Sequence, residues 1–309
     1  RTNVVMVASI PASELSYTDK DHSDQQRLKN LLDRLGKAVI VSVENETSEI
    51  IRRRLFEWDE RAITPDGRIM MTKDALETCN AYAGWVQAHR QQLPSLINPD
   101  LAREQFAAAY PFHPMVISVF ERKWQTLPRF QQTRGILRLL ALWVSRTYQD
   151  GYKGARKEPL ITLGTAPMDD AMFRAAMFEQ LGETRLEAAV TTDIAGKKDS
   201  HAVRLDGEAI AAIKKARLHT KVATTIFFES NGGQVGAEAK EASLPEIRLA
   251  VGDPESDIGN IETVLDALAD SCYYLNVEKT RYKFSLKENL NKRFADRRAT
   301  IRNDAVDEE

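Results

Sequence analysis

The chain has 309 residues, of which 43% are hydrophobic and 28% charged, an ordinary profile for a soluble chain of two or three domains. Its formal net charge of −2 gives no overall attraction to nucleic acid, so any basic surface is local. Cys79 and Cys272 form neither a CxxC motif nor a Cys/His cluster, which argues against a structural zinc site or disulfide framework and favours a cytoplasmic location.

The first 45 residues predict part of a parallel sheet. Residues 4–10 and 38–43 are apolar segments typical of strands buried on both faces. Between them "SDQQRLKNLLDRL" predicts a helix with four leucines on one face, which makes the segment a βαβ unit with a right-handed crossover. Because two parallel strands do not form a stable sheet alone, we expect further strands upstream of Arg1 and interpret the chain as a fragment. It shows no signal-peptide pattern and no apolar run long enough to span a bilayer.

Residues 47–58, "TSEIIRRRLFEW", predict a helix capped by Thr47 or Ser48. Its three consecutive arginines are spread by about 100° each around the helix. They therefore do not form one basic patch, and we expect solvated helix surface rather than a nuclear-localisation signal.

Residues 72–147 predict a bundle of helices with short, Pro-marked connections. One helix begins with Asn98 as cap and Pro99 at its first position, and His113 is interpreted as a structural residue that fixes a turn. Lys123 is interpreted as an ordinary surface charge. The last helix, "TRGILRLLALWVSRTY", has an apolar stripe of Leu137, Leu140, Ala141 and Val144.

The polar, Gly- and Lys-rich residues 149–159 predict a linker. Beyond a region of small α/β elements, the chain predicts a long helix from residue 208, a short helix capped by Ser243, and a third helix, "DIGNIETVLDALAD". Two alternating runs around "NVEKT" then predict a β-hairpin. Three helices followed by a hairpin is the order of a winged-helix domain.

The order of these predicted elements resembles the second half of an AAA+ ATPase module. It consists of a strand that ends in a small polar residue ("VVMVAS"), a helix that ends in "LLDR", a second strand, a helical bundle with a late "GILR", and a winged helix. The phrases "RRRLFE", "YPFHP", "FQQTRGILRLLA" and "YYLNVEKTRYKF" resemble in particular a poorly characterised bacterial and archaeal family of large AAA+ proteins. Genes of that family are often found near DNA methyltransferases and helicases in phage-defence clusters. The resemblance covers most of the chain, and "FQQTRGILRLLA" is its most specific part.

The resemblance implies catalytic roles for two residues of the first segment. Arg34 matches the arginine finger, which enters the nucleotide site of a neighbouring subunit, and a planar, permanently charged guanidinium suits the γ-phosphate oxygens. Ser9 matches sensor 1, which orients the attacking water. The alternatives are that Arg34 caps its own helix and that Ser9 is simply a polar strand end.

Arg138 matches sensor 2, the lid arginine that contacts the γ-phosphate. Arg134 is four residues earlier on the same helix and shares a face with it, so either side chain, or both, is a candidate for binding ATP phosphate. The alternative is a pair of solvated arginines on an amphipathic helix.

The ATP- and magnesium-binding loop itself is not in this sequence. GxxxxGK[ST] does not occur, because "RLGKAV" and "IAGKKD" lack both the upstream glycine and the following Ser or Thr. We expect ATP and Mg²⁺ to be bound mostly by residues upstream, no metal site in this chain, and no ATP hydrolysis by the chain alone.

A second hypothesis is a winged-helix DNA-binding module. The helix that would enter the major groove is acidic, so phosphate contacts are expected only from the hairpin residues Lys279, Arg281 and Lys283. A third hypothesis is a non-catalytic scaffold. We favour an ATPase that forms homo-oligomers and does not bind membranes. Its winged helix is expected to contact protein, with DNA as a weak partner.

The predicted fold is mainly α with an α/β start. Its expected parts are the end of the AAA+ core (1–60), a helical lid (61–150), a linker with small α/β elements (151–205), a winged-helix-like domain (206–300) and a polar tail (301–309).

Overall fold

The computed structural model describes residues 46–65, 69–124, 126–127, 132–154, 158–196, 199–232 and 240–287, with Asn289 and Arg297. The chain divides into two units, residues 1–44 and 45–309, and every described residue belongs to the second. The strands predicted at 4–10 and 38–43, the helix between them, and the polar tail lie outside the described residues.

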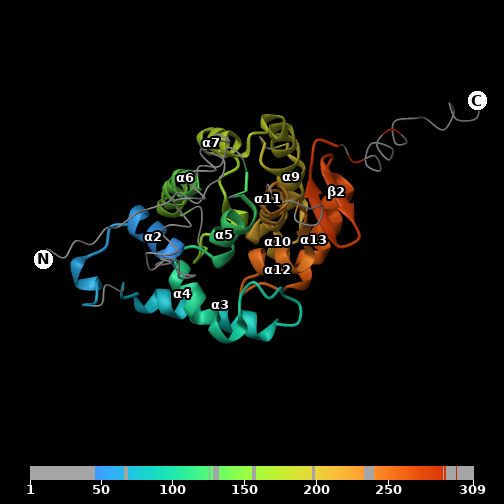
Figure 1. The fold of residues 1–309 in the computed structure, drawn as a ribbon. Coiled ribbons are helices and arrows are strands. Elements are labelled where there is room, and N and C mark those ends of the chain that lie inside the picture. Colours follow the sequence, from blue (N-terminus) through green and yellow to red (C-terminus); the bar gives the residue numbers. More distant parts are fainter. Residues whose placement is uncertain are drawn as a thin grey trace, which may run out of the picture. The chain divides into compact units, whose positions relative to one another are not determined.

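The described residues are mainly helical, with one small sheet, as predicted for this part of the chain (Figure 1). The α-helices are α2 (Glu46–Leu55), α3 (Lys73–Ala88), α4 (Ala102–Ala109), α5 (Pro114–Val119), α6 (Gln132–Tyr152), α7 (Ala171–Leu181), α8 (Glu187–Ala189), α9 (His201–Glu208), α10 (Ala211–Ala216), α11 (Leu218–Ser230), α12 (Leu244–Val251) and α13 (Gly259–Ser271). Shorter helical turns are η2 (Glu60–Ala62), η3 (Pro99–Leu101), η4 (Phe120–Trp124), η5 (Leu163–Thr165), η6 (Thr184–Leu186) and η7 (Val190–Ile194). None of the described helices is long and apolar enough to cross a membrane.

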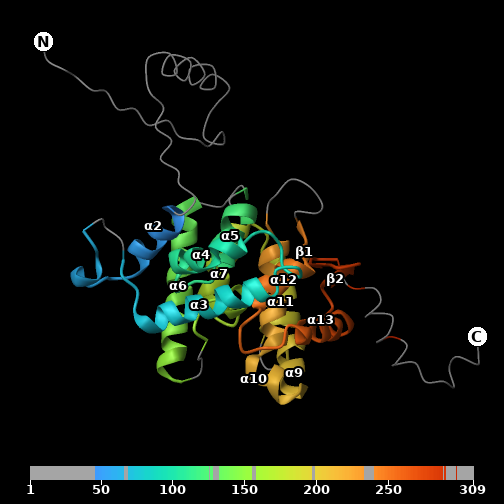
Figure 2. The same cartoon turned by 90° about the horizontal axis from the view of Figure 1, so that it is seen from below.

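The sheet is formed by β1 (Ala242–Ser243), β2 (Leu275–Glu278) and β3 (Arg281–Phe284) in the antiparallel order β1-β3-β2. The hairpin β2–β3 was predicted from its alternating pattern, and its register pairs Glu278 with Arg281 and Leu275 with Phe284. β1 was not predicted, because a two-residue strand has no periodicity to detect. Figure 2 shows β1 and β2 close to α12, at one side of the described part.

Helix α11 is the centre of this part of the chain. All of its residues except Lys221 are buried, and it contacts α9, α12, α13, β3 and η5. A helix that is buried on every side belongs to a core rather than to a surface. Its first turn is held by Asp206, whose carboxylate accepts hydrogen bonds from the backbone N–H groups of His219 (2.8 Å) and Thr220 (3.1 Å).

The predicted boundaries between lid, linker and winged helix do not separate packing units. One hydrophobic core runs from Ile51 to Phe284 and includes Phe173, Met177 and Ile194 from the predicted linker region. The first residues of the predicted linker, 149–152, instead form the last turn of α6, and α7 packs against α6 while α9 packs against α11. In the region predicted to hold small α/β elements, Ile161 forms only an isolated bridge with Phe112.

Two local predictions about charged residues were wrong. Arg52 is only 5% exposed rather than solvated, and it donates hydrogen bonds to the carbonyl oxygens of Ala107 and Ala108 at the end of α4. The long helix predicted from residue 208 is broken at Arg217, which has a left-handed φ of 52° and separates α10 from α11. Both outcomes depend on packing partners distant in the sequence.

Gly164 in η5 sits directly against the backbone of α11. A Cβ atom at this position would lie 2.7 Å from Cβ and 2.9 Å from Cα of Lys221. Since backbone atoms cannot yield, η5 would have to move away from the central helix. By contrast, Gly84 in α3 and Gly207 in α9 have open space where a methyl group would lie.

We expect Gly164→Ala to destabilise the chain by about 1–3 kcal/mol through this overpacking. Gly84→Ala is the matched control and should be neutral or stabilising by up to about 1 kcal/mol, because Ala favours a helix over Gly. Urea unfolding followed by circular dichroism measures both. Equal stabilities of the two variants would contradict the close approach of η5 to α11.

His113 caps α5, in line with its interpretation as a structural residue. Its Nδ1 atom accepts a hydrogen bond from the backbone N–H of Met115 (3.2 Å), and its ring packs edge-on against Phe106. The side chain is buried, and burial lowers its pKa from the ordinary 6.5 to about 3. The ring is therefore neutral at pH 7, as an Nδ1 acceptor must be.

This lowered pKa predicts a loss of stability in mild acid. Protons bind the unfolded chain more tightly than the folded one, so the contribution of His113 is complete above pH 6.5 and declines as the pH falls towards 3. Relative to His113→Asn, which keeps a cap acceptor but does not titrate, the free energy of unfolding of the wild type should fall by up to about 2 kcal/mol between pH 7 and pH 5. Parallel pH–stability curves for the two proteins would contradict it.

Candidate functional site

The two candidate phosphate-binding arginines lie on α6, and the structure places both on its exposed side. Arg134 is exposed, and Arg138 is exposed and donates to Glu179 Oε2 of α7 over 2.6 Å. Because more than half of each partner in this ion pair is accessible to solvent, the pair is weak and exchangeable. The guanidinium groups are therefore accessible to an external anion.

The apolar stripe predicted for α6 is correct for three of its four positions. Leu140 is buried, and Leu137 and Val144 are half-buried against the core. Ala141 was assigned to the wrong face, since it is exposed and lies seven residues from Arg134, almost two full turns along the same face. Arg34 and Ser9 lie outside the described residues, so the structure does not relate them to the arginines of α6.

The three predicted nucleic-acid contacts lie on the hairpin, one in its turn and two on β3, the central strand of the sheet. Lys279 is exposed in the turn, with a left-handed φ of 56°. Arg281 and Lys283 alternate along β3 with the buried Tyr282 and Phe284, so they share one half-exposed side. The neighbouring helix α13 carries carboxylates instead, from Glu262, Asp266 and Asp270.

A buried ionic cluster connects η4, α11 and α12, and little in the sequence indicates it. The Lys123 ammonium lies 2.8 Å from the Glu229 carboxylate, and these residues are 3% and 0% exposed. Arg122 contacts Glu229 at 3.2 Å and Glu246 at 3.3 Å. The prediction that Lys123 is a surface charge was therefore wrong. The sequence signal that could have indicated its burial is the spacing of three residues from Phe120, which places Lys123 on the same buried side of η4.

The environment of Glu246 shows how this cluster balances burial against charge. Burial raises the pKa of its carboxyl, but Lys123, the Ser243 N–H and hydroxyl, and Arg122 together hold that pKa below its usual value. Ser243 and Glu246 also form a capping box at the start of α12. The charged groups of this cluster pair with one another and hold η4, α11 and α12 together, so they are poorly placed to bind a ligand.

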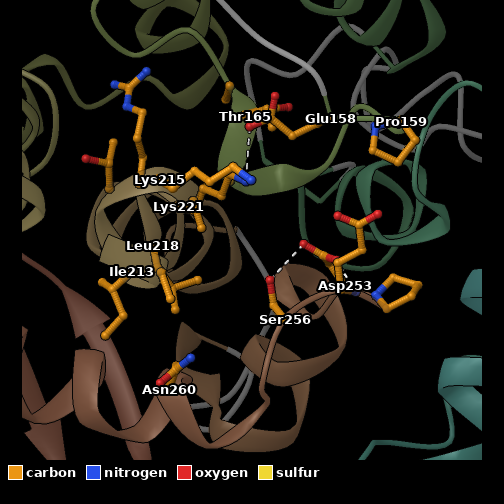
Figure 3. Close-up of a pocket in the computed structure, with 18 of the residues that line it drawn as sticks. Glu158, Pro159, Thr165, Ile213, Lys215, Leu218, Lys221, Asp253, Ser256 and Asn260 are labelled. Atoms are coloured by element: carbon orange, nitrogen blue, oxygen red, sulfur yellow. Dashed lines mark hydrogen bonds and ion pairs between the residues drawn. The ribbon is translucent and has the colours of Figure 1, made fainter. Parts of the chain in front are cut away.

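A groove of about 1320 Å³ lies between α3, the segment around η5, the α10–α11 junction and the loop before α13 (Figure 3). Charged groups of both signs line it. Lys221 is paired with Glu158 at 3.1 Å, and Asp253 accepts a hydrogen bond from Ser256. Arg217, in its left-handed conformation, also lines the groove. Such a groove has the size and mixed polarity to receive a small molecule or a peptide segment.

The described residues contain no clustered metal ligands. Among them, no group of three or more His, Cys, Asp or Glu side chains is arranged to hold a metal ion. Cys79 and Cys272 are both buried. The buried Asp193 is occupied by the backbone N–H groups of Tyr273 (3.1 Å) and Tyr274 (2.7 Å) and by His201, and so positions the start of β2.

Comparison with known protein families identifies the chain. The sequence model of a protein family described as "DUF499 second domain" matches residues 42–284, so the chain belongs to that family. No curated protein and no solved structure is detectably similar to it.

Proposed function

We propose that this chain is the helical lid and winged-helix part of an AAA+ ATPase, in which the α6 arginines sense nucleotide phosphate. The observation that carries the proposal is the placement of Arg134 and Arg138 on one exposed face in the first half of a long helix. Two guanidinium groups that reach solvent from a rigid helix are suited to bind phosphate oxygens without reorganising the core. The resemblance of "FQQTRGILRLLA" to AAA+ lids supports the same assignment.

The C-terminal elements support the second half of the proposal. They follow in the order α11, β1, α12, α13, β2 and β3, with the sheet order β1-β3-β2. This is the arrangement of a winged-helix domain: a helix is followed by a short strand, two more helices and a hairpin, and the hairpin pairs with the short strand. In this proposal α13 is the equivalent of a recognition helix and the turn around Lys279 is the wing.

The charges of this winged helix favour a protein partner. Helix α13 carries Glu262, Asp266 and Asp270 and contains no Lys or Arg, so a DNA backbone would repel it. On the hairpin, Lys279 is exposed and Lys283 is half-exposed and can face phosphate, whereas Arg281 lies 4.0 Å from the Glu241 carboxylate. We therefore propose that α13 contacts protein and that DNA is a weak partner, contacted through the wing.

The remaining catalytic parts are proposed for the protein that contains the ATPase core. Arg34 would act as arginine finger in a homo-oligomer and Ser9 as sensor 1, while the P-loop and magnesium ligands come from residues that this chain does not contain. The described residues fit phosphate, through the exposed arginines, but offer no clustered ligands for Mg²⁺. ATP binding and hydrolysis would then drive remodelling of a protein or nucleic-acid complex.

The α6 arginines are tested in the protein that carries both the P-loop and this chain. Arg134→Ala and Arg138→Ala together should reduce the turnover number for ATP by about 10²–10³, because they remove charge stabilisation of the transferring phosphoryl group. The measurement is steady-state phosphate release at saturating ATP, with nucleotide binding measured separately.

Arg204→Ala is the matched control for that experiment. Arg204 is likewise an exposed helical arginine with a carboxylate partner, Glu208, but it lies on α9. The control should leave turnover unchanged. If the α6 double variant also retains full turnover, the arginines are solvated surface and the sensor proposal fails.

The wing is tested by DNA binding of the chain as a function of salt. Three phosphate contacts at most predict weak binding, with a slope of log K against log salt no steeper than about −2.7. Lys279→Ala, Arg281→Ala and Lys283→Ala combined should abolish that slope, whereas alanines at the exposed Lys73, Lys214 and Lys215 should preserve it. Tight binding with a much steeper slope would instead favour a DNA-binding module.

A further inference from the structure

The exposed face of α6 continues far beyond the two arginines. Six residues on it are exposed and follow one another at spacings of 4, 3, 4, 3 and 4: Arg134, Arg138, Ala141, Ser145, Tyr148 and Tyr152. At about 100° per residue they all lie within roughly 40° of a single line along the helix. This α6 face therefore runs for about 27 Å, the length of eighteen helical steps. An alternation of three and four is the spacing by which one helix packs along another.

The composition of the α6 face is that of an interface rather than of ordinary surface. Tyr148 is 74% exposed and Tyr152 is 86% exposed, and because they are neighbours one turn apart they form one exposed aromatic patch, which marks an interaction site. Tyr and Arg are enriched where proteins meet. Between them Ala141 and Ser145 are small enough for a second backbone to approach closely.

The order of residues on this face is self-complementary. Arg134 and Tyr152 lie nine positions on either side of Trp143, Arg138 and Tyr148 lie five positions on either side, and Ala141 and Ser145 lie two positions on either side. We propose that a second copy of this chain docks antiparallel on the α6 face, about a two-fold axis near Trp143. Each arginine then meets a tyrosine of the other copy, and the small residues meet at the centre.

The chemistry of these pairs selects the antiparallel arrangement. A guanidinium over a tyrosine ring is a favourable cation–π contact, and the planar group also stacks on the ring. In a parallel arrangement Arg134 would face Arg134 of the partner subunit, and the two charges would repel. Arg138 can retain its ion pair with Glu179 in the dimer, because Glu179 lies on α7 of the same subunit.

Trp143 gives the axis a rigid support. Its side chain is fully buried and stacks on Phe228 of α11 with ring centroids 5.8 Å apart. The helix is therefore fixed in rotation about its own axis, which keeps the six side chains directed outwards. One helix pair buries little area compared with a permanent dimer, so we expect a reversible dimer with a Kd on the order of 10 μM.

This inference goes beyond the proposed function and is tested separately from it. The dimer requires only this chain, without ATP, whereas the sensor assignment is judged by ATP turnover in the protein with the P-loop. Because both uses engage Arg134 and Arg138, the dimer and the phosphate-bound state exclude each other.

Sedimentation equilibrium of the 309-residue chain from ~1 to ~100 μM measures the dimer directly. The wild type should shift from monomer to dimer across this range. Tyr152→Arg places two arginines opposite each other and should raise the Kd at least about tenfold. The double variant Arg134→Tyr with Tyr152→Arg exchanges the pair and should restore the dimer. Met172→Ala, which removes an equally exposed apolar side chain on α7, should have no effect.

Cysteine cross-linking tests the register independently. Ala141→Cys mixed with Ser145→Cys should give disulfide-linked heterodimers under mild oxidation, because these positions face each other across the axis. Cys79 and Cys272 are buried and do not compete. A chain that stays monomeric at all concentrations, a dimer that tolerates Tyr152→Arg, or cross-links formed equally by either variant alone would overturn the proposal.

Discussion

The buried ion pair of Lys123 and Glu229 holds the elements around α11 together. A carboxylate with no solvent exposure at the end of α11 is tolerated only because an ammonium reaches it at 2.8 Å and Arg122 adds a second positive charge. Removing one member of such a buried pair typically costs about 3–5 kcal/mol, since the remaining charge stays in the core. The pair fixes η4 against α11, and through Glu246 it also fixes α12.

Aromatic stacking continues this connection to the exposed face of α6. Phe228 of α11 is stacked between Trp124 of η4, at 5.3 Å, and Trp143 of α6, at 5.8 Å. Close-packed side chains of this kind transmit displacement rather than absorb it. A ligand or partner that moves α6 therefore acts on the same central helix that supports β3 and α13. In the proposed function, this contact is the physical link between a phosphate-sensing lid and a winged helix that responds to it.

Charge is divided among these elements in a way that separates their partners. Guanidinium groups dominate the exposed start of α6, carboxylates dominate α13, and a few cations lie on the hairpin. These groups therefore offer different binding surfaces to an anion, to a second copy of the chain and to a protein partner. The groove at the α10–α11 junction has both signs of charge, and its walls come from elements on either side of α11.

Features that depend on a few neighbouring residues could be predicted from the sequence. The Asn98 and Ser243 caps, the His113 turn, the hairpin around Lys279 and the long helix over residues 133–148 all appear as expected. Caps and turns satisfy backbone groups with side chains two or three residues away, so their chemistry is visible in a short stretch of sequence. Arg138 was singled out through the resemblance of "FQQTRGILRLLA" to AAA+ lids, and the spacing of four placed Arg134 on the same face.

Which charged and small residues are buried was settled by packing in three dimensions. Lys123 and Arg52 look like surface residues in sequence, yet distant carbonyl and carboxylate groups provide the partners that allow their burial. Ala141 belongs to the exposed side because the core lies elsewhere around α6. The break at Arg217 and the groove beside it depend on how α10 and α11 pack. These outcomes depend on long-range contacts, which local patterns do not encode.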